Sequence, residues 1–382
     1  GPMPVRRRQA GPWPDIQKAF RQACLNEGYG IVEDTNGPNP AGIGVWPSNN
    51  LDGWRMSAAI THLNPMRHRI NLTVKGGVLA RKVLFEGTKA IGVEVESGGE
   101  RFNIEAERVI LSAGAIKSPH LLMLSGIGPK DQLDPFGIPV LCDLPGVGQN
   151  LWNHLSAQIA FKVKDGLSLH GDADAVHFGL HYTSEGSSEV NDMLLRTTPM
   201  MDERIPRRPW QGSSFLNDDV PADRVARLSV TLGLPDGAGY VNLASADPSV
   251  QPTFNYRYLQ HPNDKRRVRE GMRKAVGFLE SDAYKDVCDR RLHPTDDILN
   301  NDDALDLYVR QTVGTARHPS GTCRMGPDSD PTAVVDQYCN VKGVQGLSVV
   351  DASIKPRITR SGGSQATVLM MAERAVEFVA PD

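Results

Sequence analysis

The sequence lacks several features that would assign it to a special class of protein. No apolar run approaches the ~20 residues that a membrane-spanning helix needs. Five scattered cysteines never form a C-x-x-C pair, which argues against a disulfide framework and a structural zinc site. A formal charge of −3 gives no positive excess that would favour nucleic acid. We therefore expect a globular protein of a reducing, cytoplasmic compartment, with no membrane span, no nucleic-acid partner and no metal.

A complete dinucleotide-binding fingerprint is also missing. Gly126–Gly128 and Gly146–Gly148 each begin the G-x-G-x-x-G pattern, and neither completes it. The chain has instead an apolar run, Val109–Leu111, which is followed directly by the small residues Ser112–Ala115. Such a run is typical of a buried, parallel strand. We expect Ser118–Pro119 to form the N-cap and first turn of the helix that follows.

Helix and strand patterns alternate along the rest of the chain. Helical spacing of apolar residues follows Pro14, and Gly28 stands where a C-cap belongs. Residues 71–106 carry strand patterns, with turn signals at Glu86-Gly87 and Gly98-Gly99. Residues 263–279 and 293–313 have the amphipathic spacing of helices. In the last predicted helix, Met370 and Met371 are interpreted as core residues rather than as ligands.

Asp351 follows the apolar run Leu347–Val350 directly. An acid at the carboxyl end of a buried strand lies where open α/β sheets bind their ligands. An aspartate in this position also suits the cap of the following turn. The residues alone leave both interpretations open.

His318 precedes a proline in the stretch GTARHPSGTCRMG, residues 314–326. Because a residue before proline is pushed toward extended geometry, we expect this histidine on a loop or strand end. Imidazole is the side chain whose ordinary pKa suits general acid–base work at neutral pH. An isolated His-Pro pair is more often a surface turn, so the motif needs support from other parts of the chain.

Five stretches together resemble the glucose–methanol–choline (GMC) family of flavin oxidoreductases, in the order and separation that the family shows. They are DGWRMSAAITHLNP (52–65), SAGAIKSPHLLMLSGIG (112–128), LPGVGQNLWNH (144–154), HPSGTCRMG (318–326) and LSVVDAS (347–353). The resemblance implies a mixed α/β (α+β) fold. In it, an FAD-binding Rossmann-like domain interleaves with a substrate domain built on an antiparallel sheet flanked by helices.

The resemblance also implies a division of the chain. Residues 1–65 and 151–340 would belong to the substrate domain, and residues 66–150 and 341–382 to the FAD domain. Family members open with a βαβ unit that holds the FAD pyrophosphate, and no counterpart occurs here. The FAD domain is therefore expected to be incomplete, and an N-terminal FAD-binding segment of the same protein is the expected partner.

Site residues follow from the same resemblance, with His318 as the general base. The implied cofactor contacts are Ala80, Ser112, Ala113, Asp351, Ala352, Gly363, Ser364 and Gln365. Active members usually place an asparagine or histidine opposite the base, and that position falls on Gly363, which has no side chain. His154 is expected to be structural.

The implied function is FAD-dependent oxidation of an alcohol to a carbonyl, with O2 or another electron acceptor. Trp46, Phe178 and Trp210 are expected to line the substrate pocket. The overall resemblance to alcohol-oxidising members implies an aromatic or furanic primary alcohol as the substrate. Two alternatives remain. Gly363 motivates a flavin-dependent lyase or decarboxylase on the same fold. The missing βαβ unit motivates a non-catalytic fragment or binding subunit that needs an N-terminal partner.

Overall fold

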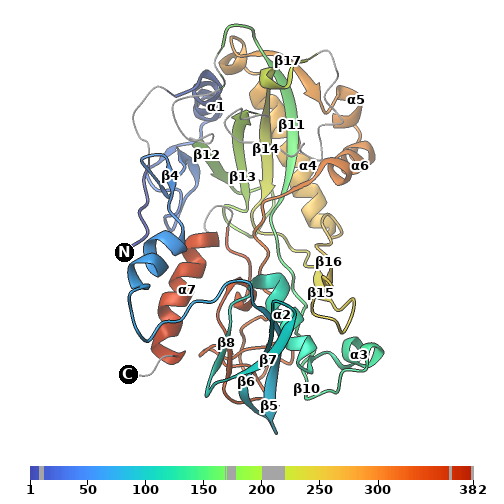
Figure 1. Cartoon of the computed structure of the whole chain (residues 1–382). Coiled ribbons are helices and arrows are strands. Elements are labelled where there is room, and N and C mark those ends of the chain that lie inside the picture. The colour runs from blue at the N-terminus through green and yellow to red at the C-terminus, as the bar shows by residue number, and fades with distance from the viewer. Residues whose placement is uncertain (8–12, 168, 170–177, 200–219, 361–363, 380–382) are drawn as a thin grey trace.

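A computed structural model describes residues 1–7, 13–167, 169, 178–199, 220–360 and 364–379. Figure 1 shows two regions, one built around a large sheet and the other around smaller sheets at the opposite end. Each region has its own hydrophobic cluster. The chain passes repeatedly between the regions: the first cluster takes residues from 16–43, 155–232 and 259–309, and the second from 83–151, 241–243 and 323–375. This arrangement agrees with the interleaved α/β fold expected from the sequence; the domain limits at 65, 150 and 340 remain predictions.

The large sheet has the strand order β1-β2-β12-β13-β14-β11-β17, and β18 also pairs with β11. All neighbours are antiparallel except the short β1–β2 pair. The strands are β1 (Ile31–Val32), β2 (Gly42–Val45), β11 (Leu155–Val163), β12 (Phe178–Tyr182), β13 (Met193–Pro199), β14 (Val225–Leu232), β17 (Cys288–His293) and β18 (Gly314–Thr315).

One face of this sheet is apolar because alternate residues of a strand point to the same side. Ile159 of β11, Val230 of β14 and Leu195 of β13 are fully buried there. The helices α1 (Asp15–Asn26), α4 (Pro262–Glu280) and α6 (Asp302–Thr312) pack on this face and complete the first cluster. The opposite face is polar and is described with the site below.

The second region contains a three-stranded antiparallel sheet and a two-stranded parallel one. Its main elements are β5 (Leu79–Glu86), β6 (Lys89–Ser97), β7 (Glu100–Glu105), β8 (Val109–Leu111), α2 (Gly114–Leu124), β19 (Leu347–Val349) and α7 (Ser364–Val379). Strands β8 and β19 run parallel, with Val109 beside Leu347 and Leu111 beside Val349. Ile110 of β8 is 43% exposed, whereas parallel sheets are ordinarily covered on both faces.

Short elements complete the described part of the chain. They are β3 (Asn50–Leu51), β4 (Trp54–Arg55), a π-helical turn (Ala59–Leu63), β9 (Ile127–Gly128), α3 (Lys130–Leu133), β10 (Cys142–Asp143), β15 (Tyr240–Asn242), β16 (Thr253–Asn255), α5 (Asp296–Leu299), and 3-10 turns at Asn64–Met66, Asp134–Phe136, Ala222–Arg224, Asp282–Tyr284 and Ala352–Ile354. In the described residues, no helix is long and apolar enough to cross a membrane.

Helix α2 corrects the expectation that Ser118–Pro119 would start a helix. The helix begins four residues earlier, at Gly114, and Pro119 lies inside it. Proline has no N–H to donate to the carbonyl four residues before it, that of Ala115. The Thr322 hydroxyl donates to this carbonyl instead, at 2.6 Å. Thr322, from the segment that carries His318, thereby supplies the hydrogen bond that Pro119 cannot make.

Other expectations had mixed outcomes. Helix α1 ends as expected, with Gly28 at φ +82° just after it. The strand expected at 71–74 is absent, and the helix expected over 293–313 is divided, because the Asn301 side chain caps α6 through two backbone N–H groups. Met370 is 57% exposed rather than part of the core.

Candidate active site

The carboxyl ends of β8 and β19 are joined by polar contacts from the residues that follow them. The Ser112 hydroxyl donates to the Val350 carbonyl at 2.9 Å. One oxygen of Asp351 accepts the Gly114 N–H at 2.8 Å and the Ser118 hydroxyl at 2.5 Å. Its other oxygen accepts the Ser353 N–H at 2.7 Å, and thus caps the turn after β19. The capping role considered for Asp351 is therefore real, and its carboxylate connects both loops at this sheet edge.

The His318 segment reaches the same edge. Beyond Pro319, backbone N–H groups of Gly321, Cys323 and Met325 donate to the carbonyls of residues 352, 353 and 354, at 3.1, 2.8 and 2.9 Å. This ladder runs directly alongside the turn that Asp351 caps. His318 consequently lies where the large sheet meets the ends of β8 and β19, although more than 200 residues separate it from Ser112 in sequence.

Two consecutive residues, Asn153 and His154, hold His318 in place. The Asn153 side-chain oxygen accepts the His318 backbone N–H at 2.9 Å, and its amide donates to the Thr315 hydroxyl at 2.6 Å. The ring Nδ1 atoms of His154 and His318 lie 2.9 Å apart, with the rings nearly perpendicular at 87°. His154 is completely buried, and its Nε2 lies 2.9 Å from the Thr359 carbonyl oxygen.

These contacts determine the tautomers of both rings. A carbonyl only accepts, so His154 Nε2 must carry its proton and donate to Thr359. A neutral His154 then has a lone pair at Nδ1, and the short contact requires His318 Nδ1 to donate to it. The lone pair of a neutral His318 is therefore on Nε2. The reverse assignment would place two lone pairs against each other at His154 Nε2 and Thr359.

Both imidazoles are held neutral. Burial, followed by the charges of Arg196 and Lys355, lowers the pKa of His318 to about 4. Burial, the charge of His318 and that of Lys355 lower the pKa of His154 to about 3, against an opposing effect of carbonyls at Thr359 and Gly233. At neutral pH, His318 is therefore ready to accept a proton.

A buried polar face of the large sheet continues from His154. His154 lies two residues before Ser156 of β11, so both point to the side opposite the apolar core. We call this side the polar sheet face; it comprises Ser156, Gln158, His181, Arg196, Thr198, Arg227, Ser229 and Thr231. Hydrogen bonds link Ser229 to Gln158 at 2.7 Å and Gln158 to Ser156 at 2.9 Å. Ligand cavities orient their ligand with a few placed polar groups, so we expect the substrate on this side of the sheet.

Trp46 lies flat on this polar sheet face. Its indole is stacked on His181, with ring centroids 6.1 Å apart and an interplanar angle of 2°. The Arg196 guanidinium lies over the same indole, 5.2 Å from its centroid. Gly179 makes room, because a Cβ there would approach the indole to 2.8 Å. The expectation that Trp46 borders the pocket is consistent with this geometry.

Comparison with known proteins assigns the chain to a family. Two family models described as GMC oxidoreductase match residues 1–156 and 235–372. A GMC-type oxidoreductase of Rhodococcus erythropolis, itself uncharacterized, is 36% identical over the whole chain, which covers 71% of that relative.

The chain belongs to the GMC oxidoreductase family.

Two further comparisons show what the chain is similar to within the GMC family. Human mitochondrial choline dehydrogenase is 36% identical over 99% of the chain, which spans 65% of that relative's length. The structure of pyridoxine 4-oxidase from Mesorbium loti superimposes with a TM-score of 0.86 and 28% identity. That match covers 99% of this chain and 72% of the oxidase.

The GMC resemblance expected several cofactor contacts, and the structure brings most of them to one edge. Ser112 and Ala113 are exposed there, beside the half-buried Ala352. The first residue of α7, Ser364, accepts a 3.3 Å hydrogen bond from the Lys355 ammonium, and Gln365 beside it is exposed. Gly363 and Trp210 lie outside the described residues. Ala80 is exposed on β5, beside Val95 of β6.

One pocket residue expected from the sequence was wrong. Phe178 points into the apolar core, where its ring packs edge-on against Trp13 with centroids 4.7 Å apart. Strand alternation is the reason, because Phe178 and Gly179 face opposite sides of the sheet and only the Gly179 side meets Trp46. The available signal was Gly179, which follows Phe178 directly. A residue without a side chain there indicates that the Gly179 face of the strand, and not the Phe178 face, approaches another ring.

Lys355 is a site residue that sequence reasoning missed. It is 1% exposed and follows the turn that Asp351 caps. Burial lowers its pKa to about 8. In the described part of the chain, no carboxylate forms an ion pair with it. A lysine placed this deeply beside two histidines gives the site a positive potential that the sequence pattern did not indicate.

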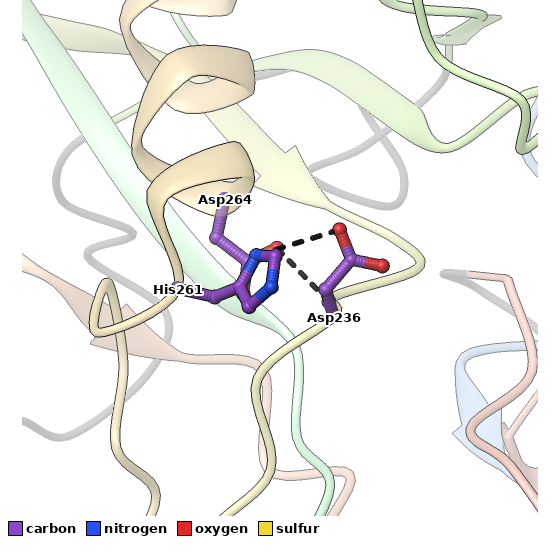
Figure 2. Close-up of side chains that lie close together, drawn as sticks. All are labelled: Asp236, His261 and Asp264. Carbon is purple, nitrogen blue, oxygen red and sulfur yellow. Dashed lines mark hydrogen bonds and ion pairs between the residues drawn. The ribbon is translucent and has the colours of Figure 1, made fainter.

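A separate cluster, Asp236, His261 and Asp264, has the spacing of metal ligands (Figure 2). Its carboxylates are already engaged by the buried Arg267, which donates to Asp264 at 2.6 Å and to Asp236 at 3.0 Å. Arg267 also donates to Asp192 at 3.0 Å. A guanidinium occupies the position that a cation would need, so the cluster is best described as an ion-pair network that attaches α4 to the loop after β14.

Proposed function

We propose that this GMC-family chain oxidises an alcohol to a carbonyl, with FAD as the cofactor and His318 as the general base. The observation that carries the proposal is the 2.9 Å contact between the ring Nδ1 atoms of His154 and His318, from which the tautomer of His318 follows. Its Nδ1 is committed to His154, so its remaining lone pair at Nε2 is available for the substrate hydroxyl. A base of this kind commonly contributes about 10²–10⁴-fold to the rate.

The residues present fit the flavin end of FAD. Ser112 and Ala113 are exposed at the end of β8, and Gly114, with φ +81°, has no side chain, so these small residues leave the backbone there uncovered. The main chain at Asp351, Ala352, Ser364 and Gln365 would complete the contact surface, with Ala80 and Gly363 as further proposed contacts. FAD, when bound, supplies the hydride acceptor.

The chain's own residues supply the remaining steps. His318 Nε2 takes the proton of the alcohol, and the charge that develops on the substrate oxygen must then be stabilised. The position expected to do this, Gly363, has no side chain. Lys355 is a buried cation whose charge acts on both His154 and His318, and it is the proposed substitute. His154 stays neutral throughout, so no proton passes from His318 to His154.

We further propose that an N-terminal FAD-binding βαβ unit of the same protein covers the exposed side of β8. Ile110 is 43% exposed, and Ile70, Leu72 and Val74 are exposed in the segment before β5. An exposed two-stranded parallel sheet is unusual, and further strands beside β8 would bury this surface.

The five unpaired thiols support a reducing, cytoplasmic location for the protein.

The test uses the protein as the cell makes it, with any segments that flank these residues. Flavin absorbance near about 450 nm is expected, with bleaching on anaerobic addition of an oxidisable alcohol. Absence of flavin would favour the non-catalytic alternative. Bound flavin that no alcohol bleaches would favour the lyase or decarboxylase alternative. Residues 1–382 alone are expected to bind FAD more weakly than the longer protein; equal binding would remove the need for the βαβ unit.

A further inference from the structure

Three cationic side chains lie at the proposed site. Arg196 and Arg227 lie on the polar sheet face, and Lys355 lies behind His318. Arg227 donates to the Thr198 hydroxyl at 2.9 Å, and Lys355 to the Ser364 hydroxyl, both neutral acceptors. None of the three forms an ion pair with a carboxylate of the described residues. Lys355 is buried, and Arg196 and Arg227 are half-buried. A cation withdrawn from water without a counter-ion is costly, so a ligand that supplies one is favoured.

Polar atoms on the same face also lack partners. His181 is 2% exposed, and neither of its ring nitrogens makes a hydrogen bond within the described part. The Nε of Arg196 is likewise buried and without a partner there. Both side chains contact the indole of Trp46. Buried polar groups are nearly always hydrogen-bonded in native proteins, so this arrangement indicates acceptor atoms that a ligand would bring.

We infer that the site takes an alcohol that also carries a carboxylate or another anionic group, held by Arg196 and His181, and that it disfavours quaternary ammonium alcohols. This inference rests on the proposed function, since it names the substrate class of the same site. It separates the chain from relatives named choline dehydrogenase, whose named substrate is a cation. The lowered pKa values of His181 and His318 agree with it, because cations and burial contribute to both and no acid opposes them.

Turnover of matched alcohols provides the first test. Para-hydroxymethylbenzoate is compared with para-methylbenzyl alcohol, and choline with its neutral tert-butyl isostere, each by kcat/KM at neutral pH. The anionic alcohol is expected to exceed its neutral counterpart by at least about tenfold, and choline to fall below its isostere. A choline rate above that of its isostere would overturn the inference.

Variants test whether Arg196 is the cause. Arg196→Met keeps an unbranched side chain over Trp46 and removes the charge, and it should abolish the preference for the anionic alcohol. Arg196→Lys should retain part of it. The matched control is Arg101→Met, which removes one charge from the exposed strand β7 and should leave the preference unchanged. A preference that persists in Arg196→Met would overturn the assignment.

Binding separates this inference from the proposed function. Calorimetry with benzoate, benzamide and benzyltrimethylammonium needs no turnover. Benzoate is expected to bind at least about tenfold more tightly than benzamide, and Arg196→Met to remove that difference. Equal, weaker or absent benzoate binding overturns the inference even if alcohols are oxidised. Tight benzoate binding without any alcohol oxidation would uphold the anion site and refute the proposed function.

Discussion

His154 and His318 share one hydrogen bond between their Nδ1 atoms, at 2.9 Å, and the Thr359 carbonyl fixes its direction from the far side of His154. A carbonyl oxygen can only accept, so the contact with Thr359 determines the positions of both ring protons. His154 thereby does more than fill space. It acts on the proposed base as a positioning residue, without contact with the reacting atoms.

Replacement of His154 should affect the chemistry through the tautomer of His318. His154→Phe removes the acceptor for the His318 Nδ1 proton, which frees the ring to rotate and to carry the proton on Nε2. We expect kcat to fall by about 10- to 100-fold, with a smaller change in KM. His154→Gln offers both an amide donor for Thr359 and a carbonyl acceptor for His318, and should recover part of the rate.

The tautomer itself can be observed. Ring ¹⁵N shifts of the labelled protein should show His318 protonated at Nδ1 in the wild type, and mixed or reversed protonation in His154→Phe. Circular dichroism and thermal unfolding establish that the variant is folded. A wild-type His318 protonated at Nε2 would contradict the assigned role of His154, even if His318→Ala abolishes turnover.

The acid limit of activity should lie well below the ordinary pKa of histidine. His318 acts as a base only when unprotonated, and its pKa is lowered to about 4, so kcat/KM should hold down to about that pH and be lost below it. Lys355→Met removes one of the cations that lower this pKa, so the acid limit should move upward. Lys130→Met, on the exposed surface of α3, should leave the limit unchanged. An unmoved limit in Lys355→Met would show that its charge does not reach His318.

Stability should also decline on the acid side. The pKa of His181 is lowered to about 4 by burial and by the charges of Arg196 and Arg360, and His154 and His318 are lowered too. The unfolded chain therefore takes up protons below about pH 6.5 that the folded chain refuses until about pH 4.

The contribution of these histidines to the free energy of unfolding should accordingly be constant above pH 6.5 and fall as the pH drops toward 4, by up to about 1.4 kcal/mol per pH unit for each histidine. Denaturant unfolding at several pH values measures this slope. His181→Gln should reduce it, whereas the exposed His68→Gln should not. An equal slope in His181→Gln would mean that folding does not lower the pKa of His181.

Arg267 offers a stability prediction outside the site. Its guanidinium, with no exposure, is paired with Asp192 and Asp264, which are almost as deeply buried. Arg267→Met leaves these carboxylates without a counter-charge, so unfolding should become easier by about 3–5 kcal/mol. A chelator should leave the melting temperature unchanged, because the network holds its own cation. A fall in melting temperature on chelation would instead favour a metal between Asp236, His261 and Asp264.

The sequence predicted the parts of this molecule that local pattern and motif control. The strand at Val109–Leu111 and the strands β5–β7 came from short-range features, whereas the family, and with it the role expected of His318, followed from five ordered stretches. Lys355, Arg196 and the partner of His318 could not be predicted in this way. Their proximity arises because three segments that are remote in sequence come together at one sheet edge. No pattern within any one segment predicts this contact.

The same limit explains the error at Phe178 and leads to a final prediction about Gly179. Strand alternation was recognisable, but which face would meet the candidate site depended on Trp46, more than 130 residues earlier in the sequence.

Gly179→Ala should show what that contact contributes. The added Cβ would lie 2.8 and 3.0 Å from two indole carbons of Trp46. These distances are shorter than an ordinary van der Waals contact, so the indole must shift. We expect a loss of about 1–3 kcal/mol in unfolding free energy and a raised KM for the anionic alcohol, since Arg196 and His181 both rest on that ring. Gly277→Ala, exposed on α4 with no atom near its Cβ, is the matched control and should stabilise by up to about 1 kcal/mol. If Gly179→Ala were as stable and as active as the wild type, Trp46 would be free to move, and the site would not depend on its stacked position.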